Sequence, residues 1–135
     1  MKLLNSFGPN PRAVRMALLE KGIEMEFVEH DLMGGENRAE EYSAKNPGAQ
    51  MPSLELDDGT VFGETTTICE YLEETEPTPA LIPGNPAERA EIRRLVAWFD
   101  IKFEREVSAN LVGEKILRRF LRRESPNASA IRAGK

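Results

Sequence analysis

The chain has 135 residues, of which 40% are hydrophobic and 30% are charged, as in folded globular proteins. Its formal net charge of −5 argues against nucleic acid or an anionic membrane surface as the main partner. The single cysteine, Cys69, excludes an intramolecular disulfide, and no apolar run approaches membrane-spanning length. Because "MKLLNSFGPN" is too short and too polar for a signal peptide, we expect a cytoplasmic protein.

The first part of the chain predicts strands and helices in alternation. A short strand is expected at residues 2–5, followed by the loop "SFGPNP" and a helix with Pro11 in its first turn. Gly22 is well placed to cap the end of that helix. The alternating "EMEFV" predicts a second strand, and "RAEEYSAKN" predicts a short polar helix.

A hairpin and a third helix complete this pattern. The segments "SLEL" and "TVF" flank "DDG", and Asp-Gly readily takes the positive φ angles of a tight turn. From Thr65 onward, Ile68, Cys69 and Leu72 mark a helix in which the cysteine is expected to be structural. The order β-α-β-α-β-β-α implies a mixed sheet covered by helices.

The last third of the chain reads as helical. "EPTPALIPGNP" predicts a linker over residues 77–86. A long helix is then expected, with one apolar face formed by Ile92, Leu95, Val96, Phe99, Phe103 and Val107. A second helical region with Ile116, Leu117, Phe120 and Leu121 is expected to stop at "SPNASAIRAGK". Two helices cannot bury all these side chains, so we expect an incomplete helical domain with an exposed apolar face that promotes association.

The stretch "GAQMPSLEL" allows two interpretations, because proline cannot donate to a sheet ladder. Pro52 can simply begin a strand with a trans peptide bond. Alternatively, a cis-proline turn leaves the backbone of Met51 free to pair with an extended, peptide-like ligand.

Together, "NPGAQMPSLELDDG", "ETTTICEYLEE", the proline-rich linker and the helices after it resemble the cytosolic glutathione S-transferases. The resemblance covers residues 1–112 and is greatest to a bacterial branch, beta-etherase-like or nu-like. It implies an α/β fold class, with a thioredoxin-like glutathione-binding domain at residues 1–76. The linker at 77–86 and an incomplete all-α domain at 87–135 would follow.

The resemblance also implies which residues hold glutathione. In the family, the proline that matches Pro52 is cis, and the backbone that matches Met51 pairs with the cysteinyl part of the tripeptide. Glu64 and Thr65 match an acidic–hydroxyl pair that holds the γ-glutamyl end, where the start of the helix that follows favours a carboxylate. The alternative for Thr65 is a simple helix cap.

Two further positions carry weaker implications. The side-chain amide of Gln50 could meet the glycyl end of glutathione, or it could be a solvated loop residue. Asp100 stands where some relatives place an acid that reaches the glutathione amine of the neighbouring subunit in a homodimer. As a charge in the middle of a helix it could equally be a solvated surface residue.

The chemistry that the resemblance implies needs a donor that favours the glutathione thiolate, because a free thiol has a pKa of roughly 8.5. Relatives place the residue that supplies it in the loop before the first helix. Here that loop offers Asn10, Ser6 and backbone N–H groups. We favour Asn10 over Ser6, although both could be turn residues.

These features predict a glutathione S-transferase with glutathione as co-substrate, in which the thiolate attacks a hydrophobic electrophilic or ether substrate. One alternative is a glutathione-dependent peroxide or disulfide reductase, and another is a non-catalytic interaction module of the same fold. The resemblance to the glutathione S-transferases also implies a homodimer. No metal constellation is recognisable, and neither a nucleic-acid nor a membrane partner is expected.

Overall fold

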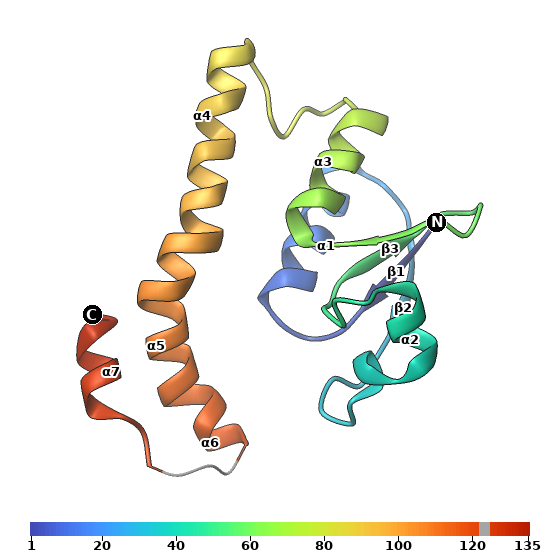
Figure 1. Cartoon of the computed structure of the whole chain (residues 1–135). Coiled ribbons are helices and arrows are strands. Elements are labelled where there is room, and N and C mark those ends of the chain that lie inside the picture. The colour runs from blue at the N-terminus through green and yellow to red at the C-terminus, as the bar shows by residue number, and fades with distance from the viewer. Residues whose placement is uncertain (122–124) are drawn as a thin grey trace. The chain divides into compact units, whose positions relative to one another are not determined.

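A four-stranded mixed sheet forms the centre of the first of two units, Met1–Leu81 and Ile82–Lys135 (Figure 1). The computed structural model describes residues 1–121 and 125–135. The strands, in the order β2-β1-β3-β4, are β1 (Lys2–Asn5), β2 (Glu26–Glu29), β3 (Ser53–Glu55) and β4 (Val61–Gly63). β1 runs parallel to β2 and antiparallel to β3, and β3 runs antiparallel to β4. The predicted mixed sheet is confirmed.

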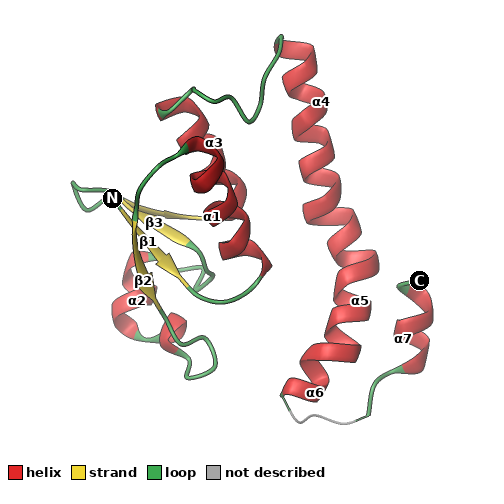
Figure 2. Ribbon diagram, turned by 180° about the vertical axis from the view of Figure 1, so that it is seen from behind, coloured by secondary structure: helices red, strands yellow, loops and turns green. Residues whose placement is uncertain are grey.

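Helices cover both faces of this sheet. α1 (Pro9–Lys21) and α3 (Thr65–Thr75) lie side by side on one face, as both views show (Figure 2). The 3₁₀ turn η1 (Glu36–Arg38) and α2 (Glu40–Lys45) belong to the other face. α1 ends at Gly22, whose φ of 67° lies in the left-handed region that glycine adopts without strain.

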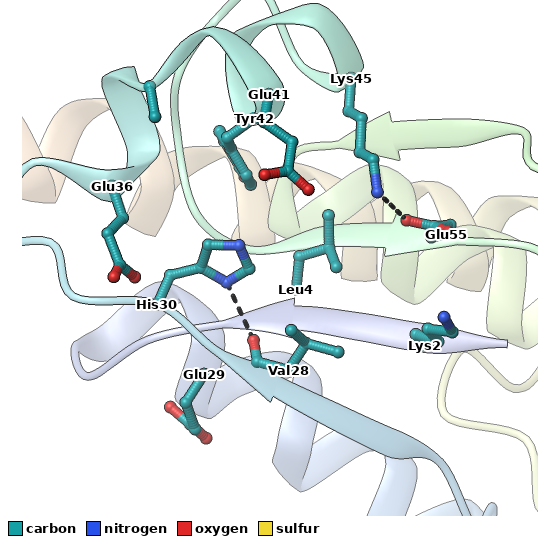
Figure 3. A pocket seen from close by; sticks show the side chains of 11 residues that line it. Lys2, Leu4, Val28, Glu29, His30, Glu36, Glu41, Tyr42, Lys45 and Glu55 are labelled. Carbon is teal, nitrogen blue, oxygen red and sulfur yellow. Dashed lines mark hydrogen bonds and ion pairs between the residues drawn. The ribbon is translucent and has the colours of Figure 1, made fainter.

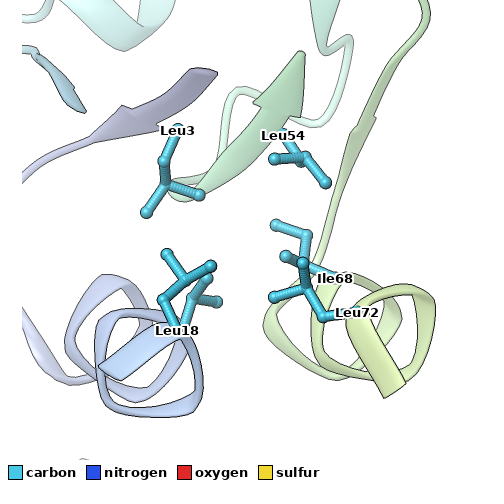
Figure 4. Close-up of a cluster of buried hydrophobic side chains, with 6 residues drawn as sticks. Leu3, Leu18, Leu54, Ile68 and Leu72 are labelled. Carbon is cyan, nitrogen blue, oxygen red and sulfur yellow. The ribbon is translucent and has the colours of Figure 1, made fainter. Parts of the chain in front are cut away.

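The two faces of β1 bury different residues because side chains alternate along a strand. Leu4 packs with Tyr42 and Met51, and Figure 3 shows Leu4 and Tyr42 on the α2 side of the sheet. Leu3 points to the other side, into the main core beneath α1 and α3 (Figure 4). That core consists of Leu3, Val14, Leu18, Leu54, Ile68 and Leu72, each at most 2% exposed. This core holds the starts of α1 and α3 next to the ends of the strands.

A buried ion pair joins α1 to the end of the first unit. Lys21 Nζ lies 2.6 Å from Glu73 Oε2, and the two side chains are 0% and 5% exposed. The same ammonium donates to the carbonyls of Glu76 and Pro79, at 2.7 and 2.9 Å. Glu73 Oε2 also accepts the N–H of Leu81, at 3.0 Å. The segment 76–81 is therefore tied to α1 by the Lys21 ammonium and to α3 by the Glu73 carboxylate.

The second unit consists of helical segments that follow one another directly from residue 86 to residue 120. They are α4 (Pro86–Ala97), the π-helical η2 (Trp98–Ser108), α5 (Ala109–Val112), the π-helical η3 (Gly113–Leu117) and α6 (Arg118–Phe120). Asn85 and Glu88 form a capping box at the start, each side chain accepting a main-chain N–H of the other. None of the residues described in these helices is buried, and Phe99 is 54% exposed. The expected exposed apolar face is confirmed.

The expected division of this region into two helices is wrong. Gly113 keeps a helical φ of −54°, and no proline lies between Pro86 and Leu121 to remove a helical hydrogen bond. The helical region ends before "SPNASAIRAGK", as expected, since α6 ends at Phe120, but a further short helix, α7 (Ala128–Ala133), forms within that segment. Asn127 begins α7 by accepting the N–H groups of Ser129 and Ala130. Among the described residues, no helix has the length and apolar character needed to cross a bilayer.

Candidate functional site

Two predicted site residues meet where α1 and α3 begin. Asn10 is the second residue of α1, and Thr65 is the first residue of α3. The Thr65 hydroxyl donates to the carbonyl oxygen of Asn10 across 3.4 Å, joining residues that are 55 positions apart. Because Glu64 rather than Thr65 is the N-cap of α3, and no side-chain capping bond forms, the hydroxyl of Thr65 is not a helix cap.

Glu64 has an unusual backbone conformation. Its φ of 70° and ψ of 124° lie outside the regions that residues with a Cβ adopt readily. Such a conformation costs about 1–3 kcal/mol and is typical of sites that bind ligands. The side chain is exposed, and its carboxylate has no hydrogen-bond partner among the residues that the structure describes. A strained residue with an available anion therefore stands directly before a helix N-terminus.

Met51 and Pro52 lie just before β3, which begins at Ser53. The Met51–Pro52 peptide bond is cis, as the resemblance implies, and Met51 is 6% exposed. Within the described part of the chain, neither the N–H nor the C=O of Met51 has a hydrogen-bond partner. The side chain of the neighbouring Gln50 is exposed. An unpaired main-chain edge is what an extended peptide would need in order to add to the sheet.

A polar network that the sequence analysis missed supports this edge. The Tyr42 hydroxyl lies 2.6 Å from Gln50 O and 2.7 Å from Ser53 Oγ. Asn46 Nδ2 donates to the same two oxygens, at 3.0 and 2.9 Å. Two signals could have pointed to it: a single aromatic residue in a polar helix, and an asparagine before Pro47. The network fixes the residues on either side of Met51-Pro52.

Replacing Tyr42 by phenylalanine tests this support. The ring would keep its packing against Leu4 and Met51, but Gln50 O and Ser53 Oγ would each lose a partner. We expect the free energy of unfolding to fall by about 1–2 kcal/mol, since buried polar groups lose hydrogen bonds. Urea denaturation measures this change, and Tyr71→Phe is the matched control, because no hydrogen bond of the Tyr71 hydroxyl is present among the described residues. Equal stability of the two variants would contradict the role of Tyr42.

The start of α1 is poor in N–H donors. Pro9 and Pro11 have no N–H, and the N–H of Arg12 already donates to Gly8 O at 3.3 Å. Asn10 thus supplies the one N–H among the first three residues of α1, and it has no acceptor among the described residues. A ligand atom at this helix start would meet the main-chain N–H and the side-chain amide of a single residue.

The other predicted residues are placed differently. Ser6 is 4% exposed and donates its hydroxyl to His30 O at 2.7 Å, so this hydroxyl would have to leave His30 to reach a ligand. Asp100 is exposed on η2 in the second unit. The catalytic role of Ser6 and the intersubunit role of Asp100 both stay predictions.

A cavity of about 360 Å³ lies on the α2 side of the sheet and contains none of the predicted site residues (Figure 3). His30 and Tyr42 meet there edge to face, and Lys45 pairs with Glu55 at 2.8 Å. The hydrogen bond from Lys45 holds the pKa of Glu55 below its usual value. In the described residues, no group of three or more His, Cys, Asp or Glu side chains could hold a metal ion. Cys69 packs, half-buried, against the main core.

A β2-β1-β3-β4 sheet with α1 and α3 on one face and a cis-proline before β3 defines a thioredoxin-like domain of the glutathione-transferase type. Residues 6–80 match the family described as "Glutathione S-transferase, N-terminal domain". The chain belongs to this family.

Similar proteins extend this likeness into the second unit. The chain is 42% identical over 130 residues to FtsZ-localized protein A of Caulobacter vibrioides, covering 94% of this chain and 56% of that protein. It is 39% identical over 104 residues to Protein LigF of a Sphingobium species, covering 74% of this chain and 40% of that one. A glutathione S-transferase structure from Rhodospirillum rubrum F11 shares 43% identity with a TM-score of 0.84, over 98% of this chain and 60% of that one. The chain therefore spans between two fifths and three fifths of the length of these relatives.

Proposed function

We propose that the chain binds glutathione and takes part in glutathione-dependent transfer to a hydrophobic electrophilic or ether substrate. The observation that carries this proposal is the strained Glu64 at the start of α3, next to a Thr65 hydroxyl that is not used as a cap. Family membership gives the fold, and this residue pair gives a reason for a ligand at that position. Backbone strain of this size persists where binding benefits from it.

The parts of the site suit the parts of the tripeptide. The start of α3 and the Thr65 hydroxyl would hold the γ-glutamyl carboxylate, and the Glu64 carboxylate would pair with the α-amino group. The free main-chain edge at Met51 would pair with the cysteinyl residue, and the amide of Gln50 would meet the glycyl end. This arrangement would direct the sulfur toward Asn10.

In the reaction, the thiolate would supply the electron pair for a new carbon–sulfur bond. The bond from that carbon to its leaving group would break, and the leaving group would depart with its electrons and take a proton from solvent. The contribution of the chain would be to favour the thiolate by donors at the start of α1. Cytoplasmic location and a homodimer in which Asp100 reaches the partner's glutathione belong to the same proposal.

Two substitutions at Glu64 test the proposal by separating the role of its carboxylate from the effect of its backbone strain. Glu64→Gly removes the carboxylate and relieves the strain at φ 70°, so we expect stability to rise or hold while glutathione affinity falls about tenfold. Glu64→Ala removes the same carboxylate but keeps the strain, so only the affinity should fall. Calorimetric titration of reduced glutathione and thermal denaturation of each variant give the two readouts. Unchanged affinity in both variants would refute the site.

A second candidate is a non-catalytic interaction module. The observation that favours it is the 42% identity, over 94% of this chain, to a protein named for its localisation with FtsZ. Under this candidate FtsZ would be the partner to test, by co-sedimentation with its polymers. A folded chain that binds FtsZ and no glutathione would favour the module over the transferase.

A further inference from the structure

Asn46 makes hydrogen bonds to four residues that follow it in the chain. Its side-chain Nδ2 donates to Gln50 O at 3.0 Å and to Ser53 Oγ at 2.9 Å, and its Oδ1 accepts the N–H of Gly48 at 3.0 Å. Its main-chain carbonyl accepts the N–H of Ala49 at 2.9 Å. Both hydrogens of the side-chain amide are therefore used, and one side chain sets the path of the main chain from α2 to β3.

These bonds orient the peptide group between Gln50 and Met51. A trans peptide group is planar, and its C=O and N–H point in opposite directions. The Gln50–Met51 bond is not among the cis bonds of the described chain. Because Gln50 O points toward Asn46 Nδ2 and the hydroxyl of Tyr42 on α2, the N–H of Met51 points away from both. This N–H has no partner among the residues that the structure describes.

The strand β4 leaves room for the Asn46 side chain. Gly63 on β4 pairs with Ser53 on β3. A Cβ added to Gly63 would lie 2.7 Å from Asn46 Nδ2, closer than real Cβ atoms approach another heavy atom. A side chain at this position would therefore displace the Asn46 amide from Gln50 O, so the hydrogen bond depends on glycine at a distant point of the sequence.

We infer that Asn46 is a positioning residue for glutathione, which directs the N–H of Met51 toward the cysteinyl carbonyl of the tripeptide. Asn46 acts through Gln50 O and does not touch the ligand. Because the peptide group already has its final direction, binding does not have to turn it over, and such preorganisation favours affinity. The inference rests on the proposed function and adds the residue that sets the direction of its main-chain edge.

A pair of ligands that differ at one carbonyl tests this role. Glutathione is compared with its (E)-alkene isostere, in which a carbon–carbon double bond replaces the cysteinyl–glycyl amide and keeps its planar shape. The isostere has no carbonyl oxygen that could accept the N–H of Met51. Calorimetric titration into the unmodified chain should give a preference of about tenfold for glutathione, as one hydrogen bond would supply.

Two variants assign the preference to Asn46. Asn46→Asp should reduce it to less than about twofold. The new carboxylate can still accept the N–H of Gly48, but it has no hydrogen to donate and repels Gln50 O, so the N–H of Met51 loses its direction. Gly63→Ala should reduce the preference in the same sense, because it displaces the Asn46 amide without changing its chemistry.

Ile68→Val is the control for lost stability. Ile68 is 0% exposed in the main core of the same unit, and the shorter side chain weakens that core without touching the loop before β3. This variant should keep the full preference for glutathione. A merely structural change lowers the folded fraction for both ligands alike and leaves the ratio of their affinities unchanged.

The outcomes separate the inference from the proposed function. If the unmodified chain binds both ligands equally, if Asn46→Asp keeps the preference, or if Ile68→Val loses it, the inference is overturned and the proposed function stays in place. Should Asn46→Asp fail to fold, Gly63→Ala decides by the same criterion. A folded, unmodified chain that binds neither ligand overturns both.

Discussion

Replacing Lys21 by methionine is expected to lower the free energy of unfolding of the first unit by about 3–5 kcal/mol. The Lys21 ammonium and the Glu73 carboxylate are both buried. Removing the ammonium therefore leaves the carboxylate in the interior without the cation that pairs with it. The carbonyls of Glu76 and Pro79 lose their donor at the same time. The cost therefore comes from the groups left behind more than from the ion pair itself.

Amide hydrogen exchange at Leu3 and Leu54 is the suitable readout, because these residues belong to the core of the first unit. Trp98 is the one tryptophan of the chain and lies in the second unit, so its fluorescence would report elsewhere. The matched control is Lys45→Met, which breaks a more exposed pair with Glu55 in the same unit and should cost less than about 1 kcal/mol. Equal effects of the two substitutions would contradict the importance of burial.

The double variant Lys21→Met with Glu73→Leu separates the two contributions. Removing both charges should recover part of the lost stability, because no unpaired ion is then buried. Recovery should stay incomplete, since the N–H of Leu81 and the carbonyls of Glu76 and Pro79 still lack partners. Full recovery would show that these main-chain contacts contribute nothing.

The second large effect is expected at Asn10. Under the proposed function, Asn10→Ala should raise the pKa of the thiol in bound glutathione by about 1–2 units. A hydrogen bond to a charged group contributes about 1.5–3 kcal/mol, and one pKa unit corresponds to about 1.4 kcal/mol. The direction is upward because the amide favours the thiolate, and its loss favours the neutral thiol. Few other donors could compensate, since Pro9 and Pro11 have no N–H.

Ultraviolet absorbance of the bound thiolate, followed against pH, measures this shift. Pro9→Ala is the opposite test, because it adds an N–H at an exposed position of the first turn and should lower the same pKa. Ser6→Ala tests Ser6, the second candidate for the donor that favours the thiolate. If Ser6→Ala raises the pKa and Asn10→Ala does not, the thiolate donor is Ser6.

Much of the first unit follows from local sequence patterns. "DDG" between two short apolar runs specifies a hairpin, and Gly22 after a helical run specifies where α1 ends. The second unit was harder to predict because continuation of a helix across residues 98–117 depends on the absence of a strong breaker. Gly113 alone does not end a helix, and the short helix that Asn127 caps lies within a segment that was expected only to end the helical region.

The candidate site was predictable only in part, because some of its residues act through contacts that are not local in the sequence. Asn10, Met51 and Thr65 stand in recognisable local contexts, such as helix starts and a proline before a strand. Tyr42 and Asn46 act through contacts across the fold, which no spacing rule reveals. The backbone angle of Glu64 is likewise set by the turn from β4 into α3 rather than by its own residue type.

The conformation of Glu64 has a consequence for laboratory evolution. A library of this chain selected only for survival after heating would favour glycine at position 64, since glycine adopts a φ of 70° without strain. Under the proposed function, a library selected for retention on immobilised glutathione would favour glutamate there. Alternating the two selections would trace, at one codon, how much thermal tolerance the protein exchanges for its ligand.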